Sequence, residues 1–135
     1  MASIRNYIDA DFPQLENILK KCGVYSEKYD TRESIRKKME HDTESVIVAE
    51  ENGQIIGCVF IIYDPWSSFI YRLGIDPDYR RRGIGNVLMQ EAERRLTKRG
   101  TNPITIFVHE DNIGALEFYR KRGWKPGQKV IDMEK

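Results

Sequence analysis

Two apolar runs joined by the dipeptide Asn52-Gly53 restrict the fold of this 135-residue chain more than any other feature. The segment reads SVIVAEENGQIIGCVFIIYD and is rich in β-branched residues. Asn-Gly favours a type I′ turn, because both central residues of that turn need a positive φ. The pattern therefore predicts an antiparallel β-hairpin, and residues 67–75 predict a third strand of the same meander after Asp64-Pro65 interrupts the second.

Helical and strand patterns on either side complete the predicted order. Apolar residues at helical spacing predict long helices at residues 11–22 and 83–99, the second ending at Gly100. Between them, Asp30 followed by Glu33 resembles a capping box and predicts a helix that ends at His41-Asp42. Two further strands are expected at residues 3–8 and 104–108, and a further helix from Asn112 to about Arg122. The tail holds at most one more strand pair, with its turn at Pro126-Gly127.

The resulting order is β-α-α-β-β-β-α-β-α-β, in which the connection through the helix at residues 83–99 joins parallel strands. We therefore expect one α+β domain over residues 1–135, with a mixed, mostly antiparallel sheet and helices on both faces.

Composition and charge exclude several classes of protein. The net charge is +1, which gives no signature of a nucleic-acid or membrane-surface partner. Cys22 and Cys58 have no metal-like spacing and are too few for a disulfide framework, so no metal is expected. No run approaches about 18 apolar residues, and the first residues do not resemble a signal peptide. We expect a cytoplasmic protein, either a monomer or a homodimer.

The run Arg80-Arg81-Arg82-Gly83-Ile84-Gly85 leads into the long helix. Glycines at Gly83 and Gly85 allow a sharp turn or the close approach of a ligand. The amides of about Arg81 to Asn86 then lie at a helix N-terminus, which suits a pyrophosphate, and the arginines suit further phosphate charge. A surface turn with solvated charges is the alternative. The run is neither a dinucleotide fingerprint nor a P-loop, because it lacks the third glycine and the Gly-Lys-Ser/Thr of those motifs.

Asn112 and Tyr119 lie seven residues apart, nearly two helical turns, and so share one helix face. Asn112 is also a typical N-cap residue, and Tyr119 beside Phe118 is typical of a core aromatic, so each has a purely structural interpretation.

Together, LGIDPDYRRRGIGNVLM and VHEDNIGALEFYRKRGW resemble the two conserved blocks of the GCN5-related N-acetyltransferase (GNAT) family, and the element order matches too. The resemblance covers most of the chain. It implies acetyl-CoA as cofactor and a central strand pair that splays apart, between the strands bearing Ile75 and Phe107. Residues that would then bind the cofactor are Leu73, Gly74 and Ile75 along the pantetheine arm, Arg80, Arg81, Arg82, Gly83, Ile84, Gly85 and Asn86 at the pyrophosphate, and Asn112 near the reactive end.

The resemblance implies that Tyr119 stands at the thioester sulfur and acts as general acid to the leaving thiolate. A tyrosine pKa of about 10 and a thiol pKa of about 8.5 make full proton transfer uphill by roughly 2 kcal/mol, so a hydrogen bond to the developing thiolate describes this role well.

The sequence departs from well-known branches of the family at the general base. Phe107 and Phe69 occupy the positions where enzymes acting on ribosomal N-termini and on histone lysines, respectively, carry a glutamate. Asp64, Glu110, Glu27 and His41 remain as candidate bases. Phe69, Tyr71 and Phe107 suggest a partly aromatic acceptor pocket. Tyr25 and Tyr29, in the loop over the acceptor side, are either substrate-facing or ordinary loop aromatics.

The expected activity is N-acetyl transfer from acetyl-CoA to a primary amine of unknown identity, by direct attack. A non-catalytic acyl-CoA-binding or sensing module on the same fold is the alternative that the missing base favours. A nucleic-acid binder built on the arginine run is disfavoured by the near-neutral charge.

Overall fold

The predicted hairpin lies at the centre of a five-stranded sheet in the computed structural model, which describes residues 2–101 and 103–135. Its strands are β2 (Val46–Glu51) and β3 (Gln54–Ile62). Asn52 and Gly53 have φ of 52° and 77°, as a type I′ turn requires, which confirms the hairpin. The other strands are β1 (Ser3–Asn6), β4 (Ser68–Ile75) and β5 (Ile104–Ile106).

The sheet has the order β1-β2-β3-β4-β5. Its first four strands are antiparallel, and β5 pairs parallel to β4 after the chain has crossed through a helix. The expected mixed, mostly antiparallel sheet is therefore confirmed.

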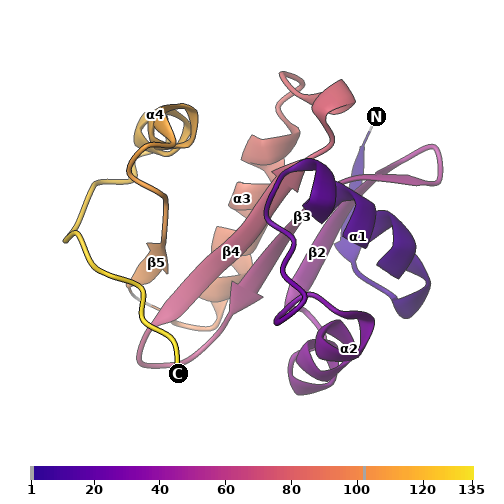
Figure 1. Ribbon diagram of the computed structural model, residues 1–135, viewed down its shortest axis with the longest axis horizontal. Helices are drawn as coiled ribbons and strands as arrows, with labels where there is room; N and C mark the ends of the chain where they lie inside the picture. The colour runs from indigo at the N-terminus through magenta and orange to yellow at the C-terminus, as the bar shows by residue number, and fades with distance from the viewer. Residues whose placement is uncertain (1, 102) are drawn as a thin grey trace.

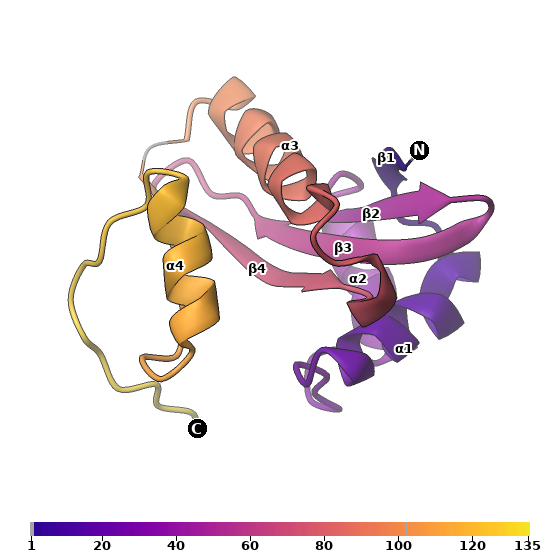
Figure 2. The ribbon, with the colours of Figure 1, turned by 90° about the horizontal axis from the view of Figure 1, so that it is seen from above.

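Helices cover both faces of the sheet, as Figure 2 shows from above. One face carries α1 (Phe12–Lys21) and α2 (Arg32–His41), and the other carries α3 (Ile84–Lys98). The last helix, α4 (Ile113–Lys121), lies beyond β5 at one side of the sheet (Figure 1). Two short 3₁₀ turns complete the elements: η1 (Asp9–Asp11) and η2 (Pro77–Tyr79).

Alternation along the strands divides the core into two clusters. Val46 and Val48 face α1 and α2, where Leu15, Ile18 and Leu19 are buried, whereas their neighbours in β2 face α3. On that second face Ile47, Ile56 and Ile61 pack with Leu88, Met89 and Leu96. Because β3 is buried on both faces, its run of apolar residues does not alternate in polarity.

Two sequence expectations are wrong. The tail carries no strand, since residues 124–135 have no regular structure, so the final β of the predicted order is absent from the described chain. The cap of α2 is Thr31, whose hydroxyl accepts from the Ser34 amide at 3.2 Å, and not Asp30. Asp30 is instead turned inward, where its carboxylate accepts from the Ser26 amide.

A β-bulge interrupts β4 and opens the sheet. The register with β3 shifts between the pairs Cys58–Gly74 and Phe60–Tyr71, so two residues of β4 lie opposite one of β3. Arg72, one of the two, has a left-handed φ of 56°. The pairing of β4 with β5 covers only residues 68–70 of β4, so the second half of β4 runs on without β5 and the expected splay is present.

The side chain of Arg72 is held by Asp30 from the α1–α2 loop. Its Nε lies 3.3 and 3.2 Å from the two carboxylate oxygens of Asp30, which is 2% exposed. The Arg72 carbonyl lies 3.4 Å from the Cys58 thiol, a weak donor. A positive φ is costly for a residue with a Cβ, so these contacts stabilise a conformation that Arg72 would otherwise avoid.

We predict that Asp30→Asn destabilises the fold, because it leaves a guanidinium in contact with a neutral amide in a mostly buried setting. The expected loss is roughly 2–3 kcal/mol of unfolding free energy in urea titrations. Asp9→Asn is the matched control, since Asp9 forms an ion pair with Arg36 at 2.7 Å on the exposed surface. Equal midpoints for the two variants would show that the Asp30–Arg72 pair does not hold the bulge.

Candidate functional site

The second half of β4 offers backbone groups at an open edge. The Asp76 amide donates to the Ile56 carbonyl of β3 at 2.8 Å. Successive residues of a strand point their N–H and C=O groups to opposite edges. The groups of Ile75 and Leu73 therefore point away from β3, toward the edge of β4 that β5 covers only at residues 68–70. The Ile75 carbonyl accepts from Arg80 Nε at 3.3 Å and lies 3.4 Å from the Cys22 thiol. By this alternation, the N–H of Ile75 and both backbone groups of Leu73 face the edge that lies beyond the described β4–β5 pairs, where an extended ligand would pair with them.

Gly74 has a packing role in this strand. A Cβ at Gly74 would lie 3.2 Å from the sulfur of Cys22, at the end of α1. The missing side chain therefore brings α1 against β4 behind the open edge, which fixes the position of the strand.

The N-terminus of α3 carries unpaired amides. Gly83 is its N-cap with a left-handed φ of 80°, and it has no side chain to cap the helix. In the part of the chain that the structure describes, no acceptor bonds the N–H groups of Ile84, Gly85 or Asn86. With Arg81 also left-handed, at φ 66°, the turn has the alternating backbone of an anion-binding nest. The geometry suits a phosphate group, because the N-terminus of the helix carries partial positive charge and its free N–H groups can donate to phosphate oxygens.

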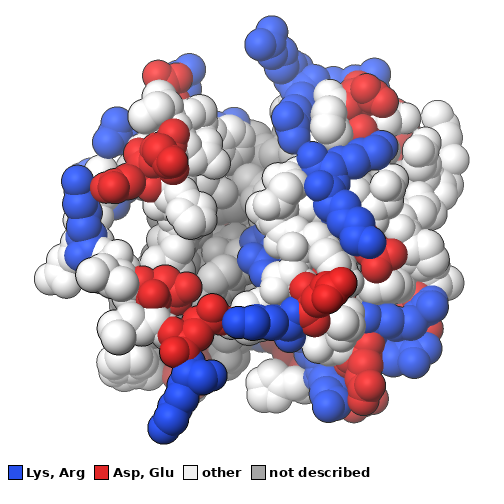
Figure 3. Space-filling model, viewed as in Figure 1, with Lys and Arg blue, Asp and Glu red and all other residues white. Residues whose placement is uncertain are grey.

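The three arginines of the turn differ in their freedom. Arg80 is bonded to the Ile75 carbonyl, and Arg82 lies 3.4 Å from Glu51 and 4.9 Å from the centre of the Tyr79 ring. Arg81 is exposed and, among the described residues, has no side-chain partner. Figure 3 shows basic side chains projecting beside the turn that leads into α3. Arg81 is therefore the arginine best placed to meet an anion at this turn.

The start of α3 is locked to α4. A Cβ at Gly85 would come within 3.3 Å of the Phe118 ring, so this glycine serves helix packing as well as the turn. Arg122 lies 3.5 Å above the same ring and donates to the Asn86 side chain at 2.8 Å. These contacts fix α4, and with it Tyr119, relative to the unpaired amides.

Tyr119 is half-buried between two aromatic rings. The Phe118 ring lies 5.1 Å away and the Trp124 ring 6.2 Å away, both edge-on. Burial raises the pKa of Tyr119, and the charge of Arg122 opposes that rise only in part. Its hydroxyl has no hydrogen-bond partner among the described residues. Tyr119 is thus a protonated donor held rigidly by its ring.

Asn112 is the N-cap of α4, and its side-chain oxygen accepts from the Ala115 amide at 3.1 Å. The structural interpretation of Asn112 therefore holds. Among the described residues only this oxygen is engaged, so the side-chain nitrogen of Asn112 is free to contact a ligand.

Three aromatic side chains from the predicted acceptor pocket form one cluster. Phe69 and Tyr71 lie on β4 and Phe107 directly follows β5, with ring centres 5.8 to 6.1 Å apart. We call Phe69, Tyr71 and Phe107 the aromatic cluster. All three side chains are aromatic, so none of them supplies a carboxylate that would act as a base.

The two loop tyrosines are placed differently. Tyr25 packs against the core beneath α1, and Lys20 Nζ lies 4.8 Å above its ring. Tyr29 is 56% exposed, and its hydroxyl donates to Glu134 of the C-terminal tail at 2.6 Å. Tyr29 therefore lies at the surface beside the tail, whereas Tyr25 belongs to the packing of the loop.

The candidate bases do not gather at the open edge. His41 and Asp64 line a shared surface hollow with Tyr63 and Arg99, at the end of the sheet where β4 begins. Glu110 forms an ion pair with Lys129 of the tail at 3.4 Å, and Glu27 is exposed in the α1–α2 loop. None of these four acids or bases contacts Tyr119 in the described structure.

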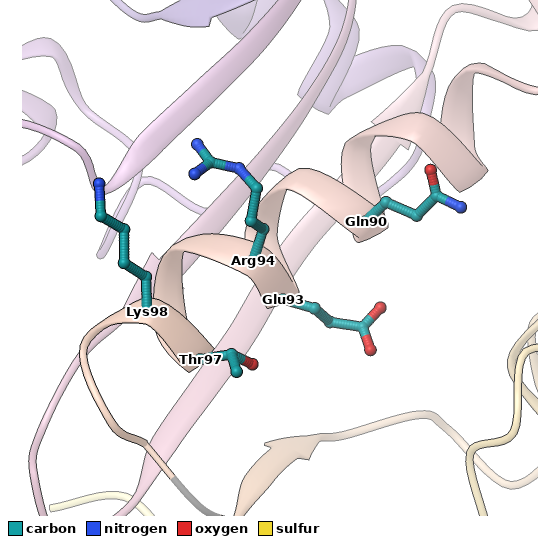
Figure 4. Close-up of a pocket in the computed structure, with 5 residues that line it drawn as sticks. All are labelled: Gln90, Glu93, Arg94, Thr97 and Lys98. Carbon is teal, nitrogen blue, oxygen red and sulfur yellow. The ribbon is translucent and has the colours of Figure 1, made fainter.

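Surface hollows elsewhere lack convergent chemistry. Figure 4 shows a shallow one on α3, formed by Gln90, Glu93, Arg94, Thr97 and Lys98 of this helix alone. By contrast, Figure 3 shows the molecule hollowed between the part that bears α4 and the rest of the sheet. In the same view, Figure 1 has β4 on one side of this region and the segment that carries β5 and α4 on the other.

Sequence reasoning missed Asp30, Arg72 and Arg122 as parts of the site. Each acts through a partner 36 or more residues away, so no local pattern marks them. None of the described helices is long and apolar enough to span a bilayer.

Comparisons with known proteins identify the family of this chain. The family model of the acetyltransferase (GNAT) family matches residues 5–124. An acetyltransferase of Yersinia pestis (strain Pestoides F) is 36% identical over 128 residues, which cover 95% of this chain and 91% of the relative.

Solved structures share the fold at lower identity. A transcriptional regulator from Bacillus halodurans superposes with a TM-score of 0.85 at 23% identity, covering 99% of both chains. The PaiA N-acetyltransferase of Thermoplasma acidophilum, in complex with coenzyme A, gives 0.78 at 23% identity over 99% of this chain and 93% of that one. With the family model matching most of the residues, this chain belongs to the GNAT acetyltransferase family.

Proposed function

We propose that this protein transfers an acetyl group from acetyl-CoA to the nitrogen of a primary amine by direct attack. The proposal is supported by three sets of groups that have no partner among the described residues, and by the contacts of Gly85 with Phe118 and of Asn86 with Arg122, which join the start of α3 to the helix that bears Tyr119. The three sets are the amides of residues 84–86, the open edge of β4, and the hydroxyl of Tyr119.

In this proposal the chain's own residues bind and orient the cofactor. The α3 amides and Arg81 bind the pyrophosphate, and Leu73 and Ile75 pair with the amides of the pantetheine arm. Acetyl-CoA supplies the activated thioester. Holding that thioester beside the amine supplies much of the rate, because an intermolecular attack becomes an effectively intramolecular one.

Tyr119 donates a hydrogen bond to the departing sulfur. As the neutral amine nitrogen bonds to the acetyl carbon, the C–S bond breaks, its electron pair stays on sulfur, and the proton that the nitrogen loses passes to water. The raised pKa of Tyr119 keeps its proton in place and makes complete transfer to sulfur less favourable than from a free tyrosine. The tyrosine therefore stabilises charge as it develops on the thiolate.

A non-catalytic acyl-CoA-binding module is the second candidate. It is supported by the aromatic rings at both positions where other branches carry a glutamate. Release of free thiol from acetyl-CoA in the presence of a panel of amines separates the two, since a binding module releases none.

We predict that Arg81→Gln weakens acetyl-CoA binding about five-fold, the value expected for losing an exposed charge pair worth roughly 1 kcal/mol. Isothermal titration calorimetry measures the change. Arg120→Gln, on the exposed surface of α4, is the charge-matched control and leaves the dissociation constant unchanged. No binding of acetyl-CoA to the unmodified protein at millimolar concentration would refute the proposed cofactor.

Tyr119→Phe is expected to lower kcat by roughly 100-fold while the KM for acetyl-CoA stays within about two-fold, because the phenyl ring retains the packing and loses only the donor. Steady-state kinetics with varied cofactor checks both values. A parallel loss of cofactor affinity would instead make Tyr119 a binding or packing residue.

The pH dependence tests whether the protein has a base. Neutralising an alkyl amine at pH 7 costs about 4–5 kcal/mol, and no described carboxylate stands beside Tyr119 to share that cost. For hexylamine, kcat/KM should rise about ten-fold per pH unit between about pH 6 and pH 9, with Tyr119 protonated throughout. A plateau near pH 7 would reveal a general base in the protein.

A further inference from the structure

The C-terminal tail, residues 125–135, crosses to the acceptor side of the molecule. Figures 1 and 2 show that it leaves the end of α4, passes outside β5 and returns to the face that carries α1 and α2. The aromatic cluster lies toward the same face, since Tyr71 packs against the core beneath α1 and α2.

Ion pairs and a hydrogen bond hold the tail at both ends. Lys129 pairs with Glu110, in the loop before α4, at 3.4 Å. Glu134 accepts from the Tyr29 hydroxyl at 2.6 Å and pairs with Lys28 at 3.6 Å. The tail therefore runs from the loop that follows β5 to the α1–α2 loop, on the side of the molecule where β4 and β5 separate.

Asp132 lies between these two anchors and has no ion-pair or hydrogen-bond partner among the described residues. The anchors at Lys129 and Glu134 place it between the loop after β5 and the α1–α2 loop, where its charge acts on Tyr71 of the aromatic cluster and on Tyr29. Burial raises the pKa of Tyr71, the charge of Arg72 lowers it, and the carboxylate of Asp132 raises it. The pKa of Tyr29 is raised by the hydrogen bond and charge of Glu134, then by burial and by Asp132.

The cations around Asp132 are already engaged. Arg72 pairs with Asp30, Lys28 with Glu134, and Lys129 with Glu110. A cation near this carboxylate is attracted by its negative charge. The quadrupoles of neighbouring aromatic rings attract the same cation independently.

We propose that the tail forms one wall of the acceptor site, and that Asp132 together with the aromatic cluster selects a small amine carrying a second positive charge. The inference rests on the proposed acetyl transfer and names the class of its acceptor.

The reacting nitrogen and the second charge occupy different places. The nitrogen must be neutral and must reach the thioester at the open edge near Leu73. Tyr71 precedes Leu73 by two residues with the bulged Arg72 between them, so the two positions lie at most roughly 7 Å apart, a distance that about five methylene groups span. A linear diamine of that length places its reacting nitrogen at the thioester and its second ammonium at the aromatic cluster.

Three acceptors of equal length test the inference: 1,5-diaminopentane, 5-amino-1-pentanol and 5-aminopentanoate. We expect kcat/KM to fall in that order. Asp132→Asn should reduce the preference for the diamine over the amino alcohol by about two- to five-fold, through KM for the amine, with KM for acetyl-CoA unchanged. Asp132→Lys should abolish the preference. Glu40→Gln, on the exposed surface of α2, is the charge-matched control.

The outcomes separate this inference from the proposal beneath it. If none of the three amines, hexylamine or any member of the amine panel releases thiol, the acetyl transfer itself fails. If the amines react but the amino alcohol matches the diamine, or if Asp132→Asn leaves their ratio unchanged, the inferred selection is overturned while the transferase stands. A preference that shrinks with added salt supports an electrostatic origin.

Discussion

One arginine in a left-handed conformation, held by one buried carboxylate, determines how the sheet opens. The bulge at Arg72 follows the last described pair of β4 with β5, and the Asp30 carboxylate holds the guanidinium from the α1–α2 loop. The open edge at Leu73 and Ile75 depends on that bulge. A straight β4 would continue to pair with a longer β5 and leave no backbone groups for a ligand.

The fold divides the proposed chemistry between its two faces. The donor side is rigid: Gly85 admits the Phe118 ring and Arg122 bonds Asn86, so the α3 amides and Tyr119 move as one unit. The acceptor side is built from longer and more exposed segments, the α1–α2 loop and the tail, which meet through Tyr29 and Glu134. A fixed donor site beside an acceptor site made of loops lets one cofactor serve different amines.

Local signals explain what the sequence could predict. Asn52-Gly53 requires positive φ at two adjacent residues, and the structure has both. The glycine-punctuated entry into α3 likewise follows from residues close together in the chain. The strand expected in the tail did not form: β5 has only three residues, and the tail's charged side chains pair with Glu110 and Lys28. Ile131 in the tail is 86% exposed and belongs to no strand of the described sheet.

Long-range partners explain what the sequence could not predict. Asp30 was assigned to a helix cap because a capping box is a local pattern, whereas its actual partner, Arg72, is 42 residues away. Gly85 was interpreted as space for a ligand, and only the fold shows the ring of Phe118 against it.

Titration of the ¹⁵N-labelled protein with coenzyme A, followed by amide chemical shifts, locates the cofactor directly. We expect the largest changes at Leu73, Ile75 and residues 84–86, with small changes along the outer surface of α3 near Arg94 and Lys98. Shifts concentrated on that outer surface, or no shifts at millimolar coenzyme A, would contradict the proposed cofactor site.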